Sequence, residues 1–173
     1  MKGFTLFEVL VVTLIMGIIM AAVLMVFSIS QRSWSSGNVS INLRDQVIRA
    51  IMTMNKELSQ GPAAGANQIN LVTGASSNSV TFYLPHDNGG YGSVVNPSGN
   101  IQWAGPYTYS LNGSKQIIRT FGATWSVLAN YVTSLQFTRS ASRIIQVNIT
   151  ARQTPTAGQQ LQDTEQAIIK IRN

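Results

Sequence analysis

The sequence predicts an α+β fold, in which a long N-terminal helix packs on an antiparallel β-sheet domain. Three observations support this prediction. Apolar residues run from Val9 to Phe27, interrupted only by Thr13 and Gly17. Apolar positions then recur at helical spacing between residues 43 and 58, and short stretches of alternating apolar and polar residues follow from residue 63 onward. We therefore expect a membrane-spanning first half of the helix, an amphipathic second half and a β-rich head.

The first part of the helix has the length of a membrane span. Residues 4–27 form a stretch of 24 residues, which is enough to cross about 30 Å of hydrocarbon. A secretory signal peptide has a shorter apolar region, of about 7–15 residues, and a more basic start than Lys2 provides. The other simple interpretation of this segment is an ordinary signal anchor, which holds a protein in the membrane and has no further role.

Glu8 does not fit an ordinary anchor. A carboxylate in hydrocarbon costs about 2.5–3.5 kcal/mol at the centre of a helix and less near its end. A segment that only anchors gains nothing from this cost, so we expect Glu8 to have a partner. The helix dipole favours a carboxylate in the first turn and disfavours an amine at the same place.

Residues 28–60 are predicted to form an amphipathic stem. A polar passage from Ser28 to Ser40 contains Gly37, which we expect to be a weak point of the helix. Apolar residues then recur in steps of four and three, which places them on one face. The residues on this face are Leu43, Val47, Ile51, Met54 and Leu58. Gly61 and Pro62 are expected to end the helix.

Residues 61–173 are predicted to form a β-rich head. Six stretches read as strands: Val80–Leu84, Tyr107–Leu111, Gln116–Phe121, Tyr131–Arg139, Ile145–Ala151 and Ala167–Ile171. Asn112-Gly113 predicts a tight hairpin turn, since both residues tolerate positive φ angles. Short connections favour an antiparallel sheet. The long polar stretch Pro85–Asn100 is expected to be an exposed loop, either contacting a neighbour or simply mobile.

The composition argues against several classes of function. The chain carries 12 Lys and Arg against 6 Asp and Glu, but the arginines are scattered, which argues against specific nucleic-acid binding. The absence of cysteine excludes disulfides, thiol catalysis and zinc–thiolate sites.

No catalytic residue, metal site or cofactor is predicted. His86-Asp87 is the sole His–carboxylate pair, and no nucleophile can be assigned to it. Asp87, Asp163 and Glu165 are too isolated for a calcium site, and no phosphate-binding loop is present. A membrane-anchored enzyme would need a buried polar cluster around His86, so we expect the protein not to be an enzyme.

Gly3-Phe4, followed four residues later by Glu8 and the apolar run, resembles the cleavage and methylation signature of type IV prepilins. The resemblance implies that a prepilin peptidase cuts after Gly3 and N-methylates Phe4. Residues 1–3 would then be a leader peptide and residues 4–27 a transmembrane and filament-core helix. It also implies that Glu8 docks against the Phe4 amine of another subunit, which would fix register along an assembly.

Beyond the N-terminus, the layout is similar to PilW-type minor pilins and J-type pseudopilins of type II secretion. The residues that carry this resemblance are Leu43-Arg44, Met54–Leu58, Val80–Phe82, Tyr107–Leu111, Ile118-Arg119 and Leu128–Phe137. The resemblance implies a minor pilus subunit that primes assembly or lies near the filament tip. The alternatives are a secretion pseudopilin that supports protein export and a pilus-borne module for adhesion or DNA uptake.

The expected location follows from the same resemblance. The protein would cross the inner membrane once, with its head outside the cytoplasm, before it enters a pilus or pseudopilus. Its expected partners are the prepilin peptidase and other pilin or pseudopilin subunits, which it contacts through the N-terminal helix.

Overall fold

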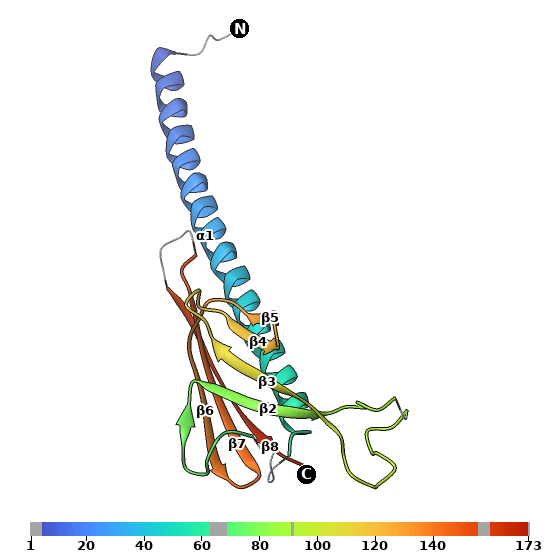
Figure 1. Cartoon of the computed structure of the whole chain (residues 1–173). Helices are drawn as coiled ribbons and strands as arrows, with labels where there is room; N and C mark the ends of the chain where they lie inside the picture. The colour runs from blue at the N-terminus through green and yellow to red at the C-terminus, as the bar shows by residue number, and fades with distance from the viewer. Residues whose placement is uncertain (1–4, 63–68, 91, 156–159, 173) are drawn as a thin grey trace.

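The computed structural model describes residues 5–62, 69–90, 92–155 and 160–172. A single helix, α1 (Leu6–Leu58), is 53 residues long and continues through Gly37 without interruption. Figure 1 shows that the N-terminal part of this helix extends far beyond the β-rich head, while its C-terminal part lies against the head. The predicted α+β class, with a long helix packed on antiparallel sheet, is confirmed. The expected weak point at Gly37 is absent from the helix as described.

The end of α1 follows the predicted signals. Ser59 is the C-cap residue, and the Gly61 N–H donates to the Leu58 carbonyl at 3.2 Å. Gly61 and Pro62 come directly after this turn. Proline lacks the N–H that another helical turn requires, so the chain leaves the helix here.

One face of the stem is buried in the head. Four of the five predicted positions, Leu43, Val47, Met54 and Leu58, are fully buried. The fifth, Ile51, is half-buried and packs against the core, while its neighbour Ala50 occupies the fully buried position. The small side chain of Ala50 lets the helix backbone approach the sheet where a larger residue would hold it away.

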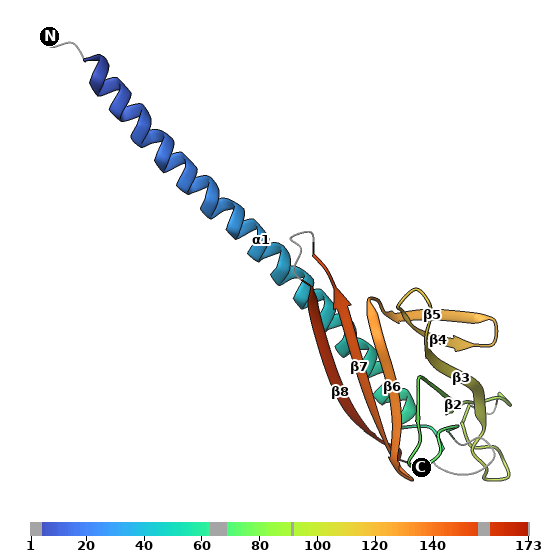
Figure 2. The ribbon, with the colours of Figure 1, turned by 90° about the vertical axis from the view of Figure 1, so that its left-hand side faces the viewer.

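The head contains two four-stranded sheets, and all neighbouring strands are antiparallel. The strands are β1 (Ser76–Ser77), β2 (Ser79–Pro85), β3 (Trp103–Leu111), β4 (Ile117–Phe121), β5 (Thr124–Ala129), β6 (Val132–Ala141), β7 (Ile144–Gln153) and β8 (Leu161–Lys170). The strand orders are β1-β6-β7-β8 and β2-β3-β4-β5. Figure 2 shows β6, β7 and β8 running beside the C-terminal part of α1, with the second sheet on their far side. The stem contacts β8, β7 and β5, and therefore touches both sheets.

All six predicted strands are present, and two were not predicted. β1 has only two residues, and in β5 the alternation is limited to Trp125 and Val127, because two further apolar residues follow. β8 begins at Leu161, six residues before the predicted start at Ala167, because its first half is polar. It pairs with β7 in register over its whole length.

The predicted hairpin between Leu111 and Ile117 is present, but a different residue makes its turn. Positive φ occurs at Lys115 (59°) and not at Gly113. The Asn112 side-chain oxygen accepts hydrogen bonds from the backbone N–H groups of Ser114 and Gln116, at 3.0 and 2.9 Å. The asparagine side chain therefore organises the loop from within.

A partly buried ion pair joins the stem to the second sheet. Glu57 Oε2 accepts hydrogen bonds from Arg119 Nε on β4, at 2.9 Å, and from the Tyr109 hydroxyl on β3. The Arg119 guanidinium lies 4.5 Å above the Tyr107 ring. Tyr109 is fully buried and its ring stacks on Phe82. We call Glu57, Tyr109 and Arg119 the stem clamp.

Arg139 shows that the scattered arginines do not all lie on solvated faces. Its side chain is buried, and it donates hydrogen bonds to the backbone carbonyls of Leu71 and Ser142. Through these two bonds Arg139 joins β6 to the chain at Leu71 and to the turn at Ser142.

Met52 and Met54 provide a matched test of stem packing. Met54 is 0% exposed and Met52 is 65% exposed. We expect Met54→Ala to lower the free energy of unfolding by about 2–5 kcal/mol, since it leaves a cavity in the core. Met52→Ala should change it by less than about 0.5 kcal/mol. Urea unfolding of the full chain in detergent, followed by near-UV circular dichroism, measures both. Equal destabilisation by the two substitutions would contradict the described packing.

The stem clamp predicts a specific response to alkaline pH. Burial, and then the hydrogen bond to Glu57 and its charge, raise the pKa of Tyr109 well above its usual value. The phenol therefore stays neutral in the native state while the unfolded chain ionises above about pH 10. Stability from this group is fully present below pH 10 and is lost as the pH rises further, by about 1.4 kcal/mol per pH unit.

Two variants isolate this effect. The free energy of unfolding is measured at several pH values between 10 and 11.5. Its slope against pH should be smaller in Tyr109→Phe than in the wild type. Tyr131→Phe, which changes an exposed residue, should keep the wild-type slope. A slope that is identical in wild type and Tyr109→Phe would show that Tyr109 is not held neutral.

Candidate functional site

The first turn of α1 is closed by a capping box formed by Thr5 and Glu8. The Thr5 hydroxyl oxygen accepts a hydrogen bond from the Glu8 N–H at 3.3 Å. In return, Glu8 Oε2 accepts from the Thr5 N–H at 3.2 Å and from the Thr5 hydroxyl at 3.1 Å. These contacts satisfy N–H groups that a helix start otherwise leaves without partners. They hold the carboxylate at the positive end of the helix dipole.

The charge of Glu8 is not compensated within the described part of the chain. Its hydrogen-bond donors there are neutral groups of Thr5. The three ion pairs among the described residues join Arg44 to Glu165, Arg49 to Asp45 and Arg119 to Glu57. Glu8 is thus positioned by a local network, and no cation of the described residues compensates its charge.

The helix behind Glu8 exposes a continuous apolar surface. From residue 5 to residue 42 no residue is buried, and the first buried side chain of α1 is Leu43. The apolar segment is long enough to cross a membrane, and none of it is buried within the chain. A helix of the core of a soluble protein would be buried, so this surface requires hydrocarbon or other helices around it.

The apolar surface continues beyond the predicted membrane span. Ile29, Trp34 and Ile41 are large exposed side chains on the stretch between the span and the head, and Trp34 is 75% exposed. Together with Val26 they line a shallow groove along α1. The composition of this stretch predicts only a polar passage, although the spacing of seven from Trp34 to Ile41 indicates a helix-packing face.

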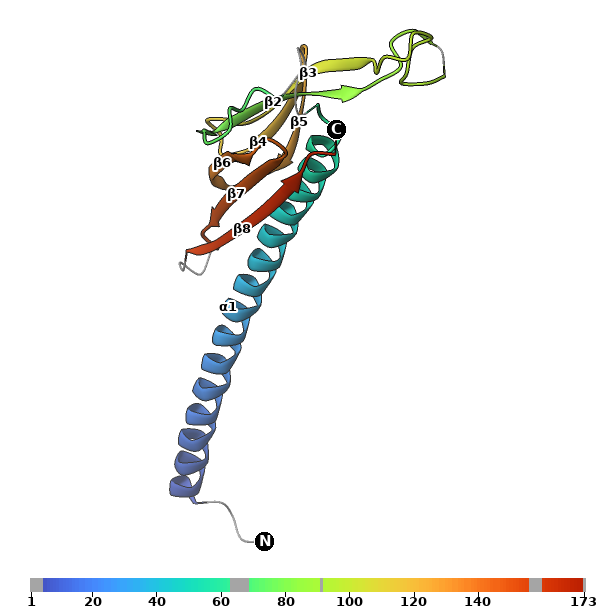
Figure 3. The ribbon, with the colours of Figure 1, turned by 90° about the horizontal axis from the view of Figure 1, so that it is seen from below.

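The other candidate residues are placed as follows. Gly3 and Phe4 lie outside the described residues. The Asp87 carboxylate accepts hydrogen bonds from the backbone N–H groups of Gly89 and Gly92 in its own loop. Figure 3 shows that the segment between β2 and β3, which contains His86 and Asp87, projects away from α1. Within the described ranges, no group of three or more His, Cys, Asp or Glu residues could hold a metal ion.

Comparison with known proteins gives one match. Residues 1–24 match the family model described as the prokaryotic N-terminal methylation motif. No similar curated protein and no similar solved structure was found. The match supports the type IV pilin and pseudopilin superfamily, and with the apolar helix it is consistent with membrane anchoring and incorporation into a pilus. It implies processing by a prepilin peptidase, assembly with other pilin subunits and the role of a structural subunit rather than an enzyme.

The capping box predicts how the helix start responds to loss of Thr5. Thr5→Ala removes the N-cap oxygen, which costs about 1 kcal/mol, so amide exchange at Phe7 and Glu8 should become about fivefold faster in the unprocessed chain. Thr13→Ala is the control, because the Thr13 hydroxyl bonds only to the Leu10 carbonyl within the helix. Hydrogen-exchange NMR in detergent micelles reports both. Unchanged exchange in Thr5→Ala would mean that the capping box does not form in solution.

Proposed function

We propose that this chain is a minor subunit of a type IV pilus-like filament that helps to initiate assembly or forms part of the tip. In this proposal a prepilin peptidase cuts after Gly3 and methylates Phe4. Glu8 then docks against the Phe4 amine of another subunit. The observation that carries the proposal is a first-turn glutamate, held by a capping box, at the start of an apolar helix that remains unburied up to residue 42.

The exposed helix suits a protein that passes from lipid into an assembly. In the bilayer, residues 4–27 are surrounded by hydrocarbon, and Glu8 lies near the end of the span where a carboxylate costs least. In a filament the same surface packs against other helices, so its burial is kept. A fully buried large apolar side chain contributes about 1.5–3 kcal/mol relative to its exposed state.

In this proposal Glu8 fixes the offset between the helices of neighbouring subunits, which apolar packing alone does not fix. Apolar helices slide past one another at little cost, whereas a charge pair is satisfied at one offset only. Thr5 gives Glu8 neutral donors and orients the carboxylate. A charged amine from a neighbouring subunit adds the compensation that these neutral donors do not provide.

We propose a domain organisation of four parts. Residues 1–3 form the leader peptide, residues 4–27 the transmembrane and filament-core helix, residues 28–60 the stem and residues 61–173 the head. The head lies outside the cytoplasm. The stem pattern on which the resemblance to PilW-type minor pilins and J-type pseudopilins depends has a structural role here, because Met54 and Leu58 are buried and Glu57 forms the stem clamp.

A strain that lacks the protein separates this function from its alternatives. Loss of filaments supports the assembly role. Normal filaments with loss of protein export would favour the secretion pseudopilin, and normal filaments with loss of adhesion or DNA uptake would favour a binding module. Complementation with the wild-type chain is the control.

Glu8→Ala tests the docking step directly. We expect leader cleavage to stay intact and incorporation into filaments to fall at least tenfold, since breaking a buried charge pair costs about 3–5 kcal/mol. Quantitative immunoblots of sheared filaments and of membranes measure the ratio. Glu165→Ala is the matched control, because it removes a carboxylate of the head that pairs with the exposed Arg44 of the stem. Glu8→Ala protein at the wild-type ratio in filaments would refute the pairing.

A further inference from the structure

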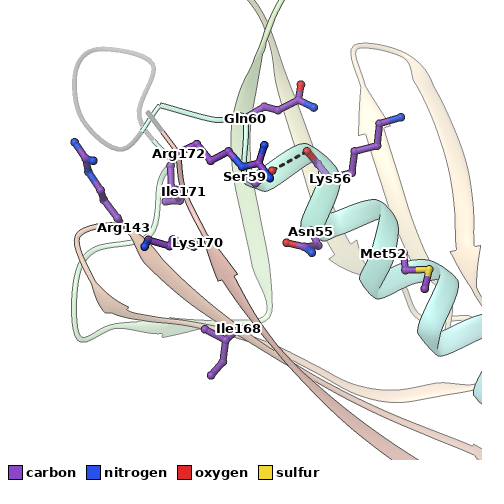
Figure 4. Close-up of a pocket in the computed structure, with 10 residues that line it drawn as sticks. All are labelled: Met52, Asn55, Lys56, Ser59, Gln60, Arg143, Ile168, Lys170, Ile171 and Arg172. Atoms are coloured by element: carbon purple, nitrogen blue, oxygen red, sulfur yellow. Dashed lines mark hydrogen bonds between the residues drawn. The ribbon is translucent and has the colours of Figure 1, made fainter.

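A groove lies where the end of α1 meets the end of β8. It has a volume of about 770 Å³ and is lined by the last turns of α1, the chain after Ile168 and the turn between β6 and β7. Backbone hydrogen bonds hold these segments together: the Arg172 N–H donates to the Ser59 carbonyl at 3.0 Å, and the Ile171 N–H donates to the Arg143 carbonyl at 2.9 Å. Figure 4 shows the lining side chains and the hydrogen bond that the Ser59 hydroxyl donates to the Lys56 carbonyl.

The groove is strongly basic. Four of its lining residues are cations, and none is an acid: Lys56, Arg143, Lys170 and Arg172. All four are exposed. Among the described residues, the three ion pairs of the chain involve other cations. The carboxylates that could have neutralised the groove, such as Glu57 and Glu165, face Arg119 and Arg44 instead.

The helix terminus accounts for only part of this charge. Cations near a helix C-terminus are stabilised by the dipole, and Lys56 lies in the last turn of α1. The dipole amounts to about half a negative charge, whereas four positive charges line the groove. The helix dipole therefore offsets only a small part of the positive charge of the groove.

The surroundings of the groove restrict the kind of anion. Lipid phosphates are out of reach, since the helix rises about 44 Å between Phe27 and Lys56. The lining contains no aromatic residue, so it offers neither a stacking platform for single-stranded bases nor the aromatic anchor of a typical protein interface. Asn55, Ser59 and Gln60 also line it, and these are residue types that contact phosphate oxygens.

We propose that this basic groove binds the sugar-phosphate backbone of double-stranded nucleic acid, without preference for base sequence. The four cations come from three segments that are far apart in the sequence, which is why the scattered basic residues gave no such indication before the fold was known. The groove lies at the opposite end of α1 from Glu8 (Figure 1), so its proposed activity is independent of filament docking.

Binding of a labelled 30-base-pair DNA duplex to the full chain in neutral detergent tests the proposal. Four phosphate contacts predict a slope of about −3.6 for the logarithm of affinity against the logarithm of salt concentration, so affinity should fall about a hundredfold between 50 and 200 mM salt. Arg143→Gln with Arg172→Gln should reduce the slope by about two units. The fall over the same salt range then becomes about tenfold. Two duplexes of unrelated sequence should bind equally.

A charge-matched double variant provides the control. Arg32→Gln with Arg152→Gln removes two exposed cations outside the groove and should leave affinity and slope close to wild type. Near-UV circular dichroism checks that each variant is folded. Equal losses in the two double variants, or no DNA binding at 50 mM salt, would overturn the proposal. Tighter binding of polyglutamate than of the duplex would overturn it in favour of an acidic protein partner.

Discussion

The structure depends on the way in which the last part of α1 is held by the head. The apolar face from Leu43 to Leu58 is buried against both sheets, and the stem clamp adds a directed polar joint at its end. This contact holds the final four turns of the helix, and the preceding turns extend beyond the head as one uninterrupted helix (Figure 1). The described residues leave a long apolar surface of the helix exposed. Such a surface is stable in water only when lipid or other subunits cover it.

Two glutamates at opposite ends of α1 are in contrasting electrostatic states. Glu57 is paired with Arg119 and receives the Tyr109 hydroxyl, so its charge is compensated within the head. Glu8 receives only neutral donors from Thr5. Glu57 joins the helix to the head of the same chain, and in our proposal Glu8 joins the helix to a neighbouring subunit. Loss of Glu57 would leave Arg119 of the same chain without its partner. In our proposal, loss of Glu8 would leave the Phe4 amine of a neighbouring subunit without its partner.

The sequence was most informative where periodicity was strong. The apolar run and the spacing from Leu43 to Leu58 predicted α1 and its buried face, because a helix fixes which residues share a side. β5 and the first half of β8 were missed, since the alternation in β5 is limited to Trp125 and Val127 and the first half of β8 is mainly polar. The basic groove could not be foreseen either, because Lys56, Arg143 and Arg172 are brought together by backbone pairing between distant segments. The partner role of Glu57 is likewise a product of tertiary contacts with β3 and β4.

In our proposal the mature chain begins at a processed Phe4 and enters a filament through its N-terminal helix. Quantitative mass spectrometry of the N-terminal peptide, from sheared filaments and from membranes, tests it most directly. Our account predicts a methylated Phe4 terminus in filaments, at a trace ratio to a major pilin. A terminus at Met1 that is confined to membranes would contradict it and would make the helix an ordinary anchor.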